Sequence, residues 1–113
     1  MQVKTIRQKL DLKLLSGANL DCEISAAYCS DVLSDVMSKA KKNYLWITNQ
    51  NHENVLAIAF FKELSCIILT SGIIPEDDVL HKAIEKNITL LSTDLTAFEI
   101  SGELYKLGIK GKV

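Results

Sequence analysis

The sequence predicts an α/β protein with three layers, α/β/α, built on a mostly parallel sheet of about five strands. From residue 23 onward, short apolar segments of strand length alternate with longer segments of helical apolar spacing. This alternation indicates parallel strands joined by right-handed helical crossovers. The segment 66–70 is apolar almost throughout, as expected for a strand covered on both faces. With 113 residues, 48% of them hydrophobic, residues 1–113 are predicted to form one domain around one core.

The elements before residue 43 follow from apolar spacing and turn residues. Apolar side chains recur at helical spacing over residues 2–10 and 31–42, and a Gly-Ala-Asn turn follows the short apolar segment 13–15. The predictions are a helix at 2–10, a strand at 13–15, a strand at 23–29 and a helix at 31–42.

The elements after residue 43 alternate strictly. Pro75 suits the first turn of a helix, because its missing N–H is not needed there. Gly108 is a typical C-terminal cap for the last helix. The predictions are strands at 44–48, 66–70 and 88–91, and helices at 52–64, 76–86 and 94–107.

The helix predicted at 52–64 lacks a polar face, because residues 55–61 are all apolar. A helix packed on one sheet face normally has one apolar stripe and one polar face. Large exposed apolar patches are uncommon on monomers, so a second copy of the chain is expected to cover the outer side. The sequence therefore predicts a homo-oligomer, most simply a two-fold dimer through helix 52–64. The alternative is that a neighbouring helix or the N-terminal segment covers it.

Charge and composition exclude several classes of protein. The formal net charge is -1, whereas nucleic-acid binders usually carry a strong basic excess on one face. No segment approaches the ~20 apolar residues of a membrane span. The first residues lack the hydrophobic region of a signal peptide, so a cytoplasmic protein is expected. The lysine clusters fall at predicted helix ends, where they oppose the helix dipole: Lys39, Lys41 and Lys42, then Lys106, Lys110 and Lys112.

The cysteines and acidic residues predict no metal and no cofactor. The three cysteines form no Cys-x-x-Cys pair, and neither a disulfide framework nor a zinc site is indicated. Cys66 and Cys29 lie in apolar runs and are expected to be buried, whereas Cys22 is the candidate for exposure. The acidic pair Asp77-Asp78 lies at a predicted helix start, where carboxylates favour the helix dipole.

Small polar residues follow each predicted parallel strand. In open α/β sheets, ligands bind outside the carboxyl ends of the strands, where helix N-termini offer free N–H groups to an anion. The alternative interpretation is that these residues are ordinary N-caps. The predicted binding site for a small anion or nucleotide consists of Ser30, Asp31, Thr48, Asn49, Gln50, His52, Thr70, Ser71, Gly72, Ser92, Thr93 and Asp94.

No complete set of catalytic residues is present. His52 is a candidate general base that Asp31 or Asp94 could orient, but no nucleophile accompanies it. A P-loop requires Gly-x-x-x-x-Gly-Lys-[Ser/Thr], and the spacing around Gly108-Ile109-Lys110-Gly111-Lys112 does not match. A Rossmann Gly-x-Gly-x-x-Gly is also absent. A small enzyme that uses His52 stays an alternative, and a serine kinase is not predicted.

Four stretches, in this order and spacing, resemble the DRTGG domain family: Ser30-Asp31-Val32-Leu33-Ser34-Asp35-Val36-Met37, Leu45-Trp46-Ile47-Thr48, Gln50-Asn51-His52-Glu53-Asn54, and Leu91-Ser92-Thr93-Asp94 with Phe98. The resemblance spans roughly residues 3 to 108. The family is named for an Asp-Arg-x-x-Gly-Gly-type segment. Here Cys22 stands in place of the arginine, and Ala26-Ala27 in place of the two glycines.

The resemblance implies a compact α/β/α accessory module. Such domains accompany nucleotide-sensing CBS domains in regulated pyrophosphatases, occur in some phosphate acetyltransferases, and are similar to the N-terminal, non-kinase domain of HPr kinase/phosphorylase. The resulting prediction is a non-catalytic regulatory or ligand-binding module. A protein-interaction scaffold without a ligand is the second hypothesis.

Overall fold

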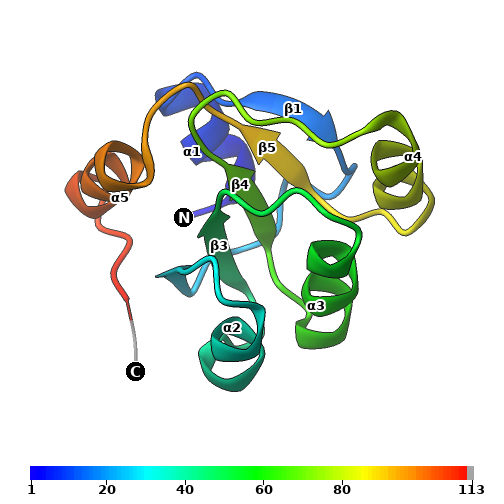
Figure 1. Ribbon diagram of the computed structural model, residues 1–113. Coiled ribbons are helices and arrows are strands. Elements are labelled where there is room, and N and C mark those ends of the chain that lie inside the picture. The colour runs from blue at the N-terminus through cyan, green and yellow to red at the C-terminus, as the bar shows by residue number, and fades with distance from the viewer. Residues whose placement is uncertain (112–113) are drawn as a thin grey trace.

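A five-stranded sheet lies between two layers of helices in the computed structural model, which describes residues 1–111 (Figure 1). The predicted fold class is confirmed. The strands are β1 (Lys13–Ser16), β2 (Ala26–Cys29), β3 (Tyr44–Thr48), β4 (Cys66–Leu69) and β5 (Leu90–Ser92). The helices are α1 (Val3–Lys9), α2 (Leu33–Lys39), α3 (Asn54–Lys62), α4 (Asp77–Glu85) and α5 (Ala97–Lys106).

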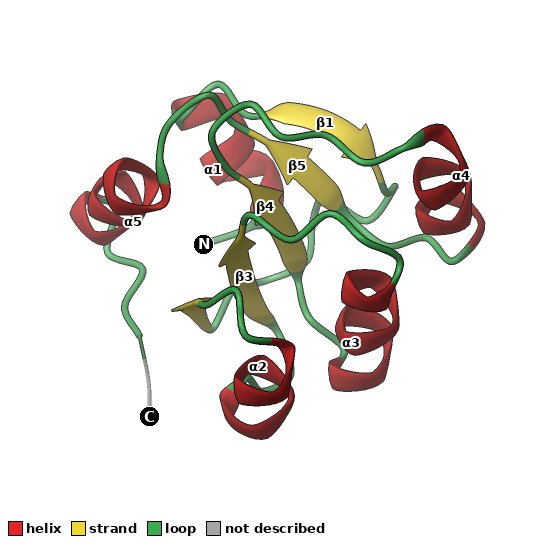
Figure 2. Ribbon diagram, viewed as in Figure 1, coloured by secondary structure: helices red, strands yellow, loops and turns green. Residues whose placement is uncertain are grey.

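The strand order explains the two helical layers. Along the sheet the order is β1-β5-β4-β3-β2, with β2 to β5 parallel and β1 antiparallel to β5. Each parallel strand adds on the same side of the previous one. Right-handed crossovers therefore place α2, α3 and α4 on one face of the sheet. The opposite face is covered by α1 and α5, as Figure 2 shows.

Each face of the sheet has its own apolar core. On the face of the crossover helices, Trp46 of β3 packs with Leu56 of α3 and Ala83 of α4. On the other face, Ile68 of β4 packs with Ile100 of α5. Strands β3 and β4 are buried at every position, as expected for central strands covered on both sides.

The structure shortens several predicted elements. Strand β2 begins at Ala26 instead of residue 23, because Glu23 and Ile24 run beside the N-terminus, where the Ile24 N–H donates to the Met1 carbonyl. Helix α5 begins at Ala97 instead of residue 94, because Thr93 to Leu95 form a hydrogen-bonded loop. Gly108 has φ +94°, and the Ile109 N–H donates to the Leu104 carbonyl, so the predicted C-terminal cap is confirmed.

Two further features concern the helices and the cysteines. None of the helices within residues 1–111 has the length and apolar character needed to cross a membrane. Cys66 is buried as predicted, but the expected burial of Cys29 is wrong. Cys29 ends the edge strand β2 and is exposed, because no further strand lies beside it. Cys22 is half-buried.

Candidate functional site

The polar loops that follow the parallel strands meet along one edge of the sheet, because all four strands end there. The twelve binding residues that the sequence analysis predicted lie on these loops, and together we call them the rim. They differ in accessibility: Thr48, Thr70 and Ser92 are buried; Ser30, Gln50 and Thr93 are half-buried; Asp31, Asn49, His52, Ser71, Gly72 and Asp94 are exposed. A ligand that approaches the rim therefore contacts the exposed residues first.

Asp31 joins the first two loops of the rim. Its Oδ1 accepts hydrogen bonds from the Thr48 hydroxyl at 2.8 Å and from the Asn49 backbone N–H at 2.7 Å. The Gln50 side-chain amide donates to the Asp31 carbonyl at 3.2 Å. A carboxylate that accepts two hydrogen bonds in this way holds the loop after β3 in one conformation.

The remaining loops are joined in the same manner. The Thr70 hydroxyl donates to Asn49 Oδ1, which connects the loops after β3 and β4. The backbone N–H groups of Ser71 and Gly72 donate to Leu95 and Thr93 carbonyls at 2.8 and 2.9 Å. A continuous set of hydrogen bonds thus runs across all the loops of the rim, so its polar groups are largely occupied within the protein.

The rim residues are not the N-caps of the helices that follow. The caps are Val32 for α2, Glu53 for α3, Glu76 for α4 and Thr96 for α5. Among the helices within residues 1–111, only α5 has a side-chain cap. It is a reciprocal pair of Thr96 and Glu99, in which the hydrogen bond from the Thr96 N–H lowers the pKa of the Glu99 carboxyl. The capping interpretation is therefore wrong for α2, α3 and α4. In α3 the Val55 and Leu56 N–H groups donate instead to the His52 and Glu53 carbonyls, which leaves the Asn54 N–H without an acceptor within residues 1–111.

Charges distinguish the helix starts at the rim. The first turn of α4 carries Asp77 and Asp78, which oppose the approach of an anion, whereas the first turn of α3 has no acidic residue. The cap of α3, Glu53, pairs with Lys82 of α4 at 2.7 Å, and this hydrogen bond raises the pKa of the Lys82 ammonium. The start of α3 is thus the helix start best suited to an anion.

His52 is exposed and lies two residues before the start of α3. Within residues 1–111 its ring makes no hydrogen bond. Asp31 was one of the two groups expected to orient this ring, but its carboxylate accepts hydrogen bonds from Thr48 and Asn49 instead. His52 therefore has the accessibility of a ligand contact, without the fixed orientation that a general base requires.

Helix α2 is fixed beside the rim by a polar cluster. The Tyr28 hydroxyl donates to Asp35 Oδ2 at 2.7 Å, and this bond lowers the pKa of the Asp35 carboxyl and raises that of Tyr28. Lys39 lies 3.3 Å from the same carboxylate. The Trp46 indole N–H donates to the Ser30 carbonyl at 2.8 Å, which fixes the start of the rim on the buried strand β3.

A hollow of about 240 Å³ adjoins the rim at the end of β5. It brings Ser92, Thr93 and Asp94 together with Asp11 and Lys13. The sequence analysis missed Asp11 and Lys13, because they join the rim only through the antiparallel pairing of β1 with β5, which sets Lys13 opposite Ser92. The residues of 1–111 form no group of three or more His, Cys, Asp or Glu placed to hold a metal ion.

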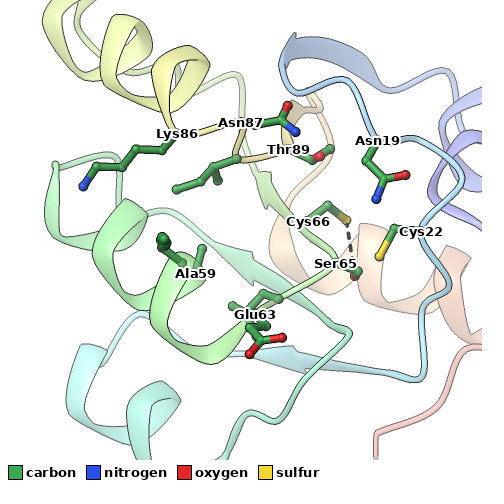
Figure 3. Close-up of a pocket in the computed structure, with 12 residues that line it drawn as sticks. Asn19, Cys22, Ala59, Glu63, Ser65, Cys66, Lys86, Asn87 and Thr89 are labelled. Atoms are coloured by element: carbon green, nitrogen blue, oxygen red, sulfur yellow. Dashed lines mark hydrogen bonds between the residues drawn. The ribbon is translucent and has the colours of Figure 1, made fainter.

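A second hollow, of about 200 Å³, lies at the opposite edge, where the parallel strands begin (Figure 3). Its polar lining includes Asn19, Cys22, Asn87 and Thr89. The sequence analysis missed this hollow as well, since Asn19 and Asn87 are far apart along the chain and meet only because β1 ends where β5 begins.

The segment from Asp21 to Ala27 corresponds to the segment for which the DRTGG family is named. It runs past this second hollow into β2. Asp21 forms an exposed ion pair with Lys4 at 2.8 Å. Ala26 and Ala27 lie in β2 without positive φ angles, so this strand does not need the glycines found in the family. The Ala27 N–H donates to the Lys110 carbonyl, which covers part of the sheet edge.

Fold and rim define a small, mostly parallel α/β domain with its polar loops gathered at the carboxyl ends of the strands. The sequence model of the DRTGG domain matches residues 5–107, so the chain belongs to the DRTGG domain family. No curated protein matches the sequence.

One solved structure is similar in fold. It contains the CBS and DRTGG domains of the regulatory region of Clostridium perfringens pyrophosphatase, in complex with the activator diadenosine tetraphosphate. The two structures superpose with a TM-score of 0.67 at 15% sequence identity, over 89% of this chain and 44% of the other. The chain therefore spans less than half of that regulatory region.

Proposed function

We propose that this DRTGG-family chain is a non-catalytic regulatory or ligand-binding module that takes a small anion or the phosphate of a nucleotide at the rim. The observation that carries the proposal is the start of α3, which has no side-chain cap, no acidic residue in its first turn and an exposed His52 beside it. The Asn54 N–H at this helix start has no hydrogen-bond acceptor within residues 1–111, which favours an anion, and the paired Glu53 adds little opposing charge.

The organisation of the rim supports the same proposal. A hydrogen-bonded set of loops holds Asn49 and Gln50 in place before a ligand arrives, so binding costs little ordering of these two residues. The regulatory region of similar fold was crystallised with a nucleotide activator, which agrees with a regulatory role for this domain. We place residues 1–113 in one cytoplasmic domain.

The test is thermal unfolding of the purified protein with inorganic phosphate, AMP, ADP, ATP and diadenosine tetraphosphate. A ligand that binds only the native state stabilises it by about 2.7 kcal/mol at a hundredfold excess over Kd. We expect His52→Ala to reduce the shift and His81→Ala to preserve it, because His81 is equally exposed but lies within α4, away from the loops. No shift with any anion, or an undiminished shift in His52→Ala, would contradict the proposal.

The second candidate function is self-association through α3. Val55, Leu56 and Ala59 pack into the core, while Phe60 and Phe61 are 57% and 72% exposed. The helix thus buries one side and presents two aromatic rings to the solvent. No described element covers this outer side, and we propose that a second copy of the chain does so in a two-fold dimer.

Light scattering during size-exclusion chromatography measures this association. We expect the parent protein to elute as a dimer and Phe61→Asp as a monomer, because a charge at the centre of an apolar interface is left unpaired. Phe98→Asp is the matched control, since Phe98 is 89% exposed on α5, on the other face of the sheet. A monomeric parent protein, or equal weakening by both variants, is incompatible with an α3 dimer.

A further inference from the structure

We propose that the hollow at the amino ends of the strands is a second ligand site, and that it takes a single neutral heterocycle, such as a free nucleobase. We call this hollow the amino-end pocket and define it by Asn19, Cys22, Phe60, Cys66, Asn87 and Thr89. It lies at the opposite edge of the sheet from the rim and is independent of the function proposed for the rim.

The size of the amino-end pocket limits the ligand. Its volume is about 200 Å³. A cavity of roughly 150 Å³ holds benzene, whereas pockets for drug-sized ligands begin at about 300 Å³. One ring system of one or two rings therefore fills the hollow.

Hydrogen-bonding groups without protein partners line one side of the pocket. Thr89 is only 6% exposed, yet its hydroxyl makes no hydrogen bond within residues 1–111. Asn87 uses its side-chain oxygen to accept the Ala18 N–H at 3.0 Å, which leaves its NH2 group available. The Asn19 side chain makes no hydrogen bond to another described residue. Figure 3 shows the three side chains gathered together.

These groups match the edge of a heterocycle. The Asn19 carboxamide offers a donor and an acceptor side by side, which is the pattern that recognises the edge of a nucleobase, and Asn87 adds its NH2 donor. The Thr89 hydroxyl reaches the hollow and has no hydrogen-bond partner within residues 1–111, so it adds a donor and an acceptor for a ligand. Phe60, which is 57% exposed, also lines the hollow and adds apolar surface.

The electrostatic surroundings favour a neutral ligand. The C-terminal ends of α3 and α4 both reach the pocket, through Glu63 and Lys86, and the negative ends of helix dipoles disfavour an anion. Burial raises the pKa of the Cys66 thiol to about 12, so this thiol stays protonated at neutral pH. Burial also raises the pKa of the half-buried Cys22. The pocket therefore lacks thiolates for a metal cation.

Alkylation of the native protein with iodoacetamide, followed by mass spectrometry of each cysteine, tests the proposal. Cys22 is half-buried in the pocket, and Cys29 is exposed at the edge of β2 and serves as an internal control. We expect saturating adenine or hypoxanthine to slow alkylation of Cys22 to the rate of buried Cys66 and to leave Cys29 unchanged. Inorganic phosphate is expected to protect neither residue.

Two variants assign the protection to the pocket. Thr89→Val keeps the side-chain volume, and we expect it to fold at least as stably as the parent, because the lost hydroxyl has no protein partner. We expect Thr89→Val and Asn19→Ala each to weaken protection about tenfold in base concentration, and Asn49→Ala at the rim to leave it unchanged. Lack of protection by both bases, equal protection in the two pocket variants, or protection by phosphate would overturn the proposal. The result is independent of His52, so failure here and failure at the rim are distinguishable.

Discussion

Gly17→Ala is expected to lower the free energy of unfolding by about 3 kcal/mol. Gly17 follows β1 with φ +108°, a backbone conformation that L side chains rarely adopt. A Cβ atom at this position would lie 2.5 Å from Thr89 Oγ1 and 2.6 Å from Thr89 Cα. Because the second contact is with backbone, rotation of a side chain cannot relieve it, and β1 must move away from β5.

Urea unfolding measures this loss, and Gly102→Ala is the matched control. Gly102 lies within α5, and a Cβ atom there would meet nothing within 4 Å. Alanine is the better helix former by about 1 kcal/mol, so this variant is expected to stabilise the protein. If Gly17→Ala unfolds at the same urea concentration as the parent, the close packing of Gly17 against Thr89 is wrong.

Asp31→Ala is expected to cost about 2 kcal/mol of stability. The variant removes the acceptor of two hydrogen bonds, from the Thr48 hydroxyl and the Asn49 N–H. The Thr48 side chain is buried, so its hydroxyl cannot regain water without local opening. The loop after β3 should then become mobile, and affinity for an anion at the rim should fall together with stability.

Urea unfolding and hydrogen exchange at the Asn49 amide measure this effect. Asp31→Asn keeps an acceptor oxygen without the charge, and we expect a smaller loss. Asp21→Ala is the control for removing a surface carboxylate, because its ion pair with Lys4 is exposed and should contribute within about 0.5 kcal/mol. Equal stability of Asp31→Ala and Asp21→Ala would mean that Asp31 does not hold the rim together.

The alternation of strands and helices could be predicted because it depends on local spacing. The central strand Tyr44–Thr48 agrees with its predicted bounds, and the amphipathic α4 begins one residue after its predicted start. Element ends were less predictable. Strand β2 loses its first residues to the N-terminus, a partner from a distant part of the chain. Helix α5 starts at Ala97, because Thr96 caps it in place of the predicted earlier start at Asp94.

For the rim, too, local sequence predicts one part and contacts between distant segments decide the other. Its residues could be predicted, because parallel strands end at one edge and polar residues follow each of them. Their roles could not. Asp31 had the residue type of an N-cap, but its partners belong to the loop after β3, which is adjacent only in the folded sheet. The burial of Thr70 and Ser92 likewise depends on neighbouring loops.

By itself, the sequence determined the fold class, the family and the edge of the sheet at which polar loops gather, because each is encoded in local periodicity or in motif order. Only the tertiary structure decided which rim groups are exposed, and it alone revealed the amino-end pocket. That pocket joins Asn19, Cys66 and Asn87 from three separated segments. Their meeting follows from strand order and from the antiparallel β1, and contacts of long sequence separation leave no signature in local spacing.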